Sequence, residues 1–208
     1  MRIDVFDFDG TIYDGDSTVD FLRYAVRRRP SLIFVLLSGV FRAGGYALTG
    51  RISLTVFKSC LFSALARHLD LSAEAERFWA DEKTQAHLGE WFLRRERTLP
   101  VVIASASPDF ELRPAARLLS ADLLVSTPCD AKTGRLTAGN CKSAEKIRRI
   151  RQELGDFEVR SMYTDNPKAD GPLLALAEER YLVTHGAVHR LTPEEFAPAE
   201  KERRDRHE

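Results

Sequence analysis

Two aspartates that stand two residues apart close the first apolar run of the chain. The sequence IDVFDFDGT places Asp7 and Asp9 at the end of this run, directly before Gly10. An apolar run of this length that stops at a glycine is typical of a buried strand that ends in a loop. Side chains two apart on a strand share a face, and like charges so close together are costly unless something neutralises them. The pair therefore indicates either a metal site or two carboxyls, one ionised and one protonated, that carry out acid–base chemistry.

Two later apolar runs also end in polar side chains. The run at 99–104 leads into Ser105, and the run at 159–163 leads to Asp165. Strands that alternate with helices predict an α/β fold, a Rossmann-like three-layer core with an open and mostly parallel sheet. Such sheets bind their ligands at the carboxyl ends of the strands. We therefore expect Ser105 and Asp165 to share one crevice with the first aspartate pair.

The remaining pattern predicts the elements that must position these residues. Residues 17–94 are expected to be helical, with a helix capped near Asp16, an apolar helix after Ser31, and Gly44–Gly45 acting as breakers. Further expected segments are helices at 52–69, 72–94 (one or two), 109–119, 142–154 (capped by Asn140) and 170–179, strands at 99–104, 122–126, 159–163 and 181–184, and a hairpin or loop at 129–139.

Four of these segments resemble, in order, the motifs of the haloacid dehalogenase-like (HAD) phosphohydrolases. They are DFDGT at the first strand, Ser105 in IASAS, Lys142 in GNCKSAEK, and Asp165 with Asp170 in YTDNPKADGPLL. The motifs span residues 7–170, which is nearly the whole body of the chain. The resemblance implies a phosphatase with the HAD fold.

The resemblance also implies a role for each motif residue. It makes Asp7 the nucleophile that forms an aspartyl-phosphate, and Asp9 the general acid for the leaving oxygen and then the base for water. A bound Mg²⁺ would screen the repulsion between a carboxylate and a phosphate dianion. The implied ligands are Asp7, Asp165 and the backbone carbonyl of Asp9 for Mg²⁺, Asp170 and Asn166 around the metal, and Thr11, Ser105 and Lys142 for the phosphate.

Several of these roles have alternatives. Ser107 is a rival for the role of Ser105 in holding the phosphate. Purely structural roles are open for four others: an exposed position in a first helical turn for Lys142, a helix cap for Asp170, and a turn for Thr11 and Asn166.

The long helical stretch after the first motif resembles the cap of the HAD subclass that contains phosphoserine phosphatase. The domains expected are a core at 1–14 and 96–193, a helical cap at 15–95 and a charged tail at 194–208. An acidic cap residue recognises the amine in phosphoserine phosphatases, yet no Glu occurs here before Glu74. The segments FLRYAVRRRPSLIFVLL and LTGR are instead similar to the cap of bacterial phosphatidylglycerophosphatases.

The net charge and its distribution along the sequence limit the kinds of partner that we expect. The formal net charge is zero, which gives no electrostatic case for nucleic acid. Residues 16–69 hold eight Lys or Arg against two acids, so they form either a solvated basic face or a basic apolar surface that contacts a membrane. The longest apolar run has ten residues, fewer than the ~20 that a membrane span needs. We expect a cytoplasmic enzyme, with peripheral membrane contact kept open.

The sequence leaves two classes of substrate open. It is a small phosphorylated metabolite or, as the alternative, a lipid phosphate such as phosphatidylglycerophosphate at the membrane surface. A non-catalytic phospholigand-binding protein is a further alternative, but it would be suggested by a broken motif, and none is broken. Transfer of the phosphoryl group to an acceptor other than water is also open.

Overall fold

A six-stranded sheet forms the centre of the molecule. In the computed structural model, which describes residues 1–192 and 195–196, its strand order is β3-β2-β1-β6-β7-β8. The five strands from β3 to β7 are parallel, and β8 runs antiparallel to β7. The strands are β1 (Arg2–Phe6), β2 (Val101–Pro108), β3 (Leu123–Thr127), β6 (Glu158–Thr164), β7 (Ala177–Thr184) and β8 (Ala187–Arg190). This confirms the mostly parallel α/β sheet that the sequence predicts.

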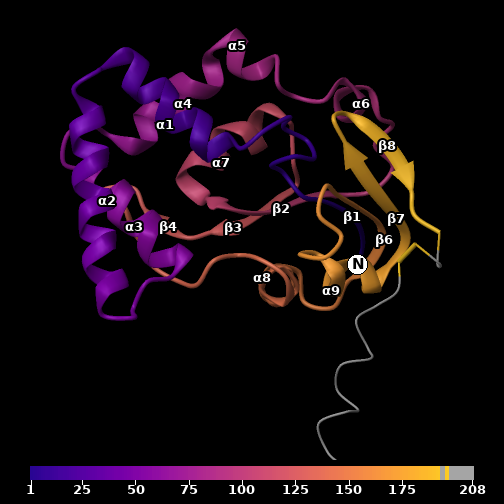
Figure 1. Cartoon of the computed structure of the whole chain (residues 1–208). Helices are drawn as coiled ribbons and strands as arrows, with labels where there is room; N and C mark the ends of the chain where they lie inside the picture. The colour runs from indigo at the N-terminus through magenta and orange to yellow at the C-terminus, as the bar shows by residue number, and fades with distance from the viewer. Residues whose placement is uncertain (193–194, 197–208) are drawn as a thin grey trace, which may run out of the picture.

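Helices cover both faces of this sheet, as Figure 1 shows, with α8 and α9 below it and α4 and α7 above it. Six helices lie between β1 and β2: α1 (Ser17–Arg28), α2 (Leu32–Leu48), α3 (Leu54–Leu65), α4 (Leu71–Ala80), α5 (Glu82–Gln85) and α6 (Glu90–Arg94). The later elements are α7 (Asp109–Leu118), a small hairpin of β4 (Cys129–Asp130) and β5 (Arg135–Leu136), α8 (Ala144–Leu154) and α9 (Gly171–Leu176).

Alternation along β1 assigns its side chains to two hydrophobic clusters. Ile3 and Val5 belong to the cluster beneath the sheet, which includes Ile150 of α8 and Leu174 of α9. Phe6 belongs to the cluster on the other face. Side chains of neighbouring strand residues point to opposite faces, so a strand buried on both sides reads as a continuous apolar run.

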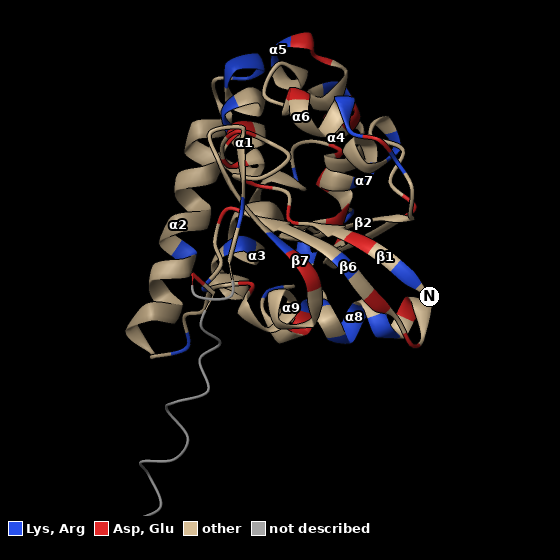
Figure 2. Ribbon diagram, turned by 90° about the vertical axis from the view of Figure 1, so that its right-hand side faces the viewer, with Lys and Arg blue, Asp and Glu red and all other residues tan. Residues whose placement is uncertain are grey.

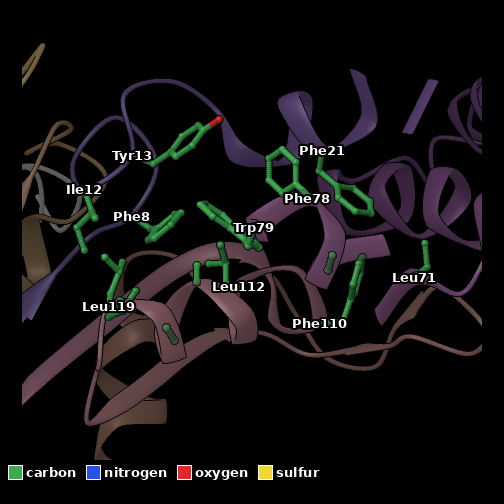
Figure 3. Packing of buried hydrophobic residues seen from close by; sticks show 14 of the residues in the cluster. Phe8, Ile12, Tyr13, Phe21, Leu71, Phe78, Trp79, Phe110, Leu112 and Leu119 are labelled. Carbon is green, nitrogen blue, oxygen red and sulfur yellow. The ribbon is translucent and has the colours of Figure 1, made fainter. Parts of the chain in front are cut away.

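A row of aromatic rings ties the helices of residues 17–80 to the sheet (Figure 3). Trp79 meets Phe8 with 5.6 Å between ring centroids and Phe78 with 5.0 Å. Phe21 of α1 continues the row, 5.7 Å from Phe78 and 5.9 Å from Phe110 of α7. All five rings belong to one hydrophobic cluster, so α1 and α4 share a core with the sheet.

Helix α2 lies at the edge of the molecule and packs against α3 (Figure 1). A Cβ at Gly39 would lie 3.0 Å from the carbonyl oxygen of Cys60, so the two backbones approach closely there. The prediction that Gly44 and Gly45 break this helix is wrong, because α2 continues through both to Leu48. Its apolar contacts with α3 outweigh the cost of about 1 kcal/mol that each helical glycine carries.

Other boundaries also differ from the prediction. The helix expected at 170–179 ends at Leu176, and β7 begins at Ala177, because this stretch pairs with β6. Residues 72–94 form three short helices, and β8 was not predicted. The expected tail at 194–208 lies outside the described residues, apart from 195–196. None of the described helices is long and apolar enough to cross a membrane.

Candidate active site

The predicted polar side chains meet at the carboxyl ends of three adjacent strands. Asp7 follows β1, Ser105 and Ser107 lie at the end of β2, and Asp165 follows β6, with β1 between the other two strands. The loops after β1 and β6 touch each other. A Cβ at Gly10, which has a φ of 72°, would lie 2.3 Å from the carboxylate of Asp165, so only glycine fits here.

A buried lysine links two of the acids. The Nζ of Lys146 donates to Asp7 at 2.8 Å and lies 2.7 Å from Asp170, and its side chain is only 4% exposed. Burial alone would lower the pKa of Lys146, but the charges of Asp7 and Asp170 raise it above its ordinary value. Burial raises the pKa of Asp7 to about 7, against the opposing effect of Lys146. Lys146 is therefore the cation of this site.

This arrangement corrects the prediction that Lys142 contacts the nucleophile. Ser143 turns the chain with a φ of 53°, and α8 begins only at Ala144. Lys142 lies before this turn and is exposed, whereas Lys146 is the third residue of the helix and lies on its buried side. The predicted cap is also wrong, since the side chain of Asn140 accepts a hydrogen bond from Thr127 instead.

Asp9 lies in the loop after β1, where its carboxylate contacts the N-terminus of α1 and accepts two hydrogen bonds. The backbone N–H of Ser17 donates to one oxygen at 2.7 Å, and the Ser107 hydroxyl donates to the other at 2.6 Å. Burial raises the pKa of Asp9, while these two donors oppose the shift. A carboxyl with a raised pKa and fixed orientation suits a general acid.

A buried glutamate that the sequence analysis missed lies behind Asp9. The Thr18 hydroxyl is 3.0 Å from Glu111 and 3.1 Å from the Ser107 hydroxyl, which in turn donates to Asp9. Each hydroxyl has only one proton to donate. An unbroken series of hydrogen bonds that ends on an ionised Asp9 therefore requires Glu111 to be protonated and to donate to Thr18. Burial and the charge of Asp9 raise the pKa of Glu111 to about 8, which agrees with this direction.

The other predicted residues have structural contacts. The Thr11 hydroxyl accepts the N–H of Asp165 at 2.8 Å and so joins the first and last loops. Ser105 is buried and accepts the N–H of Ser107 at 3.0 Å. The side chain of Asn166 accepts the N–H of Ala169 and shapes the turn. Their contacts to a phosphate or a metal stay predictions.

The donor set fits a hard cation. Among the described residues, no side chain donates to the carboxylate of Asp165, which lies beside the Asp9–Gly10 backbone. Partial burial raises the pKa of Asp165, so an added positive charge would stabilise its ionised form. The described residues contain no group of three or more His, Cys, Asp or Glu side chains close enough together to hold a metal ion by themselves. Mg²⁺ here would take two carboxylates, with backbone and water oxygens completing its shell.

Besides α1, a second helix of the segment between β1 and β2 reaches the site. Lys58 of α3 donates to the carbonyl oxygen of Ala106, between the two serines of β2, at 3.0 Å. The nearby hairpin also packs on α3, because Leu136 donates its N–H to Ser59 at 3.0 Å. The helix therefore has fixed contacts to the edge of the crevice.

Comparisons with known proteins agree with this picture. Residues 5–175 match the family of haloacid dehalogenase-like hydrolases. Protein CicA of Caulobacter vibrioides is 31% identical over an alignment of 184 positions that covers 84% of this chain and 82% of that protein. A protein of unknown function from Bordetella pertussis has a similar structure, with a TM-score of 0.61 and 23% identity over 86% of this chain and 88% of that one. A phosphoserine phosphohydrolase-like protein from Francisella tularensis gives a TM-score of 0.50 and 20% identity, covering 86% of each chain.

Proposed function

Because the chain belongs to the haloacid dehalogenase-like hydrolase family, we propose that it hydrolyses phosphate monoesters through an aspartyl-phosphate on Asp7. The observation that carries this proposal is the contact of Asp7 with Lys146 at the carboxyl end of the central strand. The contact holds the Asp7 carboxylate beside a cation that would reduce its repulsion from a phosphate dianion.

The residues present can carry both halves of the reaction. An oxygen of Asp7 attacks phosphorus, the bond between phosphorus and the ester oxygen breaks, and Asp9 gives its proton to the leaving oxygen. Asp9 then takes a proton from a water molecule that attacks the same phosphorus. The bond between Asp7 and phosphorus breaks, and inorganic phosphate leaves. Ser107 and Ser17 keep the Asp9 carboxyl in one orientation during both steps.

We propose Asp7, Asp165 and the backbone carbonyl of Asp9 as the ligands of a Mg²⁺ ion. When bound, Mg²⁺ would offset the negative charge of the phosphate and of the two carboxylates. Asp170 acts through Lys146, because it also accepts the hydroxyl of Thr164 at 2.8 Å and is only 2% exposed. It therefore fixes the position of the lysine.

Substrate choice belongs, in this proposal, to the helical cap at 15–95 above a core at 1–14 and 96–193. The primary substrate class is a small phosphorylated metabolite. A lipid phosphate is the second candidate, and one observation favours it: no acidic residue lies between Asp20 and Asp70, a stretch that includes the exposed apolar side chains of α2. Such a surface suits an anionic amphiphile.

Phosphate release with and without EDTA tests the activity. Asp7→Asn keeps the shape of the side chain but removes the nucleophilic oxygen, so turnover should fall at least about 10³-fold. Asp14→Asn is the matched control, because Asp14 lies in the same loop with a side chain that is 65% exposed, and it should keep full turnover. Full activity of Asp7→Asn would contradict the mechanism. Tight binding of phosphate esters without turnover by the unaltered protein would favour the non-catalytic alternative.

A further inference from the structure

One face of α2 exposes a stripe of large apolar side chains. Phe34, Leu37, Phe41 and Leu48 are 73%, 46%, 80% and 91% exposed. Their spacing of three, four and seven residues places them in one row along the helix. Ile33 and Val40 flank the row and are also exposed. We call these six residues the α2 stripe.

The opposite face of α2 fixes the direction of this stripe. Leu32, Gly39 and Ala43 are buried, and α2 packs on α3 through this side. The close backbone contact at Gly39 leaves α2 little freedom to roll on α3 and bury the stripe. Figure 2 shows α2 at the edge of the molecule and almost free of charged residues along its length. The described protein therefore leaves the stripe uncovered.

Positive charges lie on α2 and on the chain directly before and after it. Arg27, Arg28 and Arg29 lie before the helix, Arg42 lies within it and Arg51 follows it, and all five are exposed. Arg28 pairs with Glu74 at 3.5 Å, and no acidic residue occurs in the sequence between Asp20 and Asp70. A second copy docked face to face would bring these arginines together, and like charges repel. A bilayer surface with an apolar interior and negatively charged headgroups complements both the apolar stripe and the arginines.

We propose that the α2 stripe docks on the surface of an anionic phospholipid bilayer. The helix lies parallel to the membrane, with Phe34 and Phe41 inserted among the acyl chains near the headgroups and the arginines beside lipid phosphates. The helix has 17 residues and does not span the membrane. Docking does not require turnover at Asp7, so an experiment can contradict the docking proposal without contradicting the proposed function, and the reverse.

Vesicle flotation tests this docking. The full chain is mixed with vesicles of phosphatidylcholine alone or with 30% phosphatidylglycerol, at about 0.1 M salt. The unaltered protein should float with the anionic vesicles and bind the neutral ones at least about tenfold more weakly. Phe34→Ser with Phe41→Ser should reduce binding to anionic vesicles at least about tenfold, and Arg42→Gln with Arg51→Gln should also reduce it.

Leu118→Ser with Leu176→Ser is the matched control. These leucines are 47% and 48% exposed, stand singly on other helices, and should leave vesicle binding unchanged. Release of phosphate from p-nitrophenyl phosphate, with circular dichroism, checks that every variant is folded. Equal flotation of the Phe34/Phe41 variant and the unaltered protein would overturn the proposal. So would light scattering that shows a dimer broken by those two substitutions, because the stripe would then face a second copy.

Discussion

At the scale of single residues, the site depends on one buried cation that contacts two acids. Lys146 lies between Asp7 and Asp170, and all three side chains are largely buried. Removing one member of a buried ion pair leaves an uncompensated charge, which costs about 3–5 kcal/mol. The lysine therefore affects both stability and chemistry.

We predict that Lys146→Met lowers turnover by about 10²–10³-fold, because in the proposed mechanism Asp7 attacks a phosphate dianion beside this cation. Lys142→Met serves as the comparison, since Lys142 is exposed and should keep turnover within a factor of two. Steady-state phosphate release measures both, and thermal melting shows whether Lys146→Met is folded at the assay temperature. A large loss for Lys142→Met alone would restore the assignment made from the sequence.

A second residue-scale prediction concerns Glu111. Its pKa is about 8 in the folded protein against an ordinary value of 4.5, so the folded state binds more protons between these pH values. Stability should therefore fall as pH rises through this window, by a few kcal/mol in all. Glu111→Gln can still donate to Thr18 and carries no titrating proton. Urea unfolding at pH 5 and pH 8.5 should show a smaller pH slope for the variant, and equal slopes would refute the assignment.

The sequence predicted part of this site for identifiable physical reasons. Asp7, Asp9 and Asp165 lie at one edge of the sheet, as the sequence led us to expect, because the carboxyl ends of parallel strands share an edge; their roles stay predictions. The contact was assigned to Lys142 and not to Lys146 because a positive φ at Ser143 delays the start of α8. The residue types near Ser143 do not predict this turn. Glu111 resembled an ordinary acid in the first turn of α7, and its burial arises only from packing.

At the scale of elements, the packing of α2 on α3 separates the roles of three glycines. Gly39 sits where a Cβ would meet the backbone of Cys60 and Leu61, whereas a Cβ at Gly44 or Gly45 would meet nothing within 4 Å. Gly39 therefore permits the close contact between the two helices. Gly44 and Gly45 make no such contact and only make the helix less stable than alanine would.

We predict that Gly45→Ala stabilises the protein by about 0.5–1 kcal/mol, because alanine favours the helix and meets no neighbour. Gly39→Val should destabilise it by about 1–3 kcal/mol through the forced separation of α2 and α3. Urea unfolding of the two variants and the unaltered protein measures both effects. Stabilisation by Gly39→Val would show that the two helices do not pack as described.

Element types were easier to predict from the sequence than element ends. Buried strands such as β2 are clear apolar runs between turn residues, and each was found. The boundary between α9 and β7 was missed because residues 177–180 hold helix formers that pair with β6 in the fold. The exposed strand β8 lacks an apolar face and gave no signal.

At the scale of the whole molecule, the helical segment and the sheet share one hydrophobic cluster. Trp79 of α4 lies between Phe8 and Phe78, and its indole N–H donates to the carbonyl oxygen of Glu111 at 2.7 Å. Figure 3 shows this row of rings passing from the first loop to α1. The division at residues 15–95 was proposed from sequence, which indicates helical content but not which helices share a core.

This shared cluster predicts a single cooperative unfolding transition. Trp79→Ala should lower the free energy of unfolding by about 3–5 kcal/mol and shift the whole transition, because the cavity lies in the common core. Calorimetry and circular dichroism should give the same midpoint. Phe34→Ala, at an exposed aromatic residue, is the control and should change stability by less than about 0.5 kcal/mol. Two separate transitions would mean that the helices unfold independently.

The central place of β1 has a consequence for how the chain folds during translation. Phe6 pairs with Ile103 on one side and with Tyr163 on the other, so β1 leaves the ribosome well before both of the strands that flank it. Synthesis proceeds at roughly 5–20 residues per second, and during this interval β1 has no strand to pair with. The nascent chain therefore exposes the apolar faces of β1 during this interval, and the proposed site is complete only when β6 has joined the sheet.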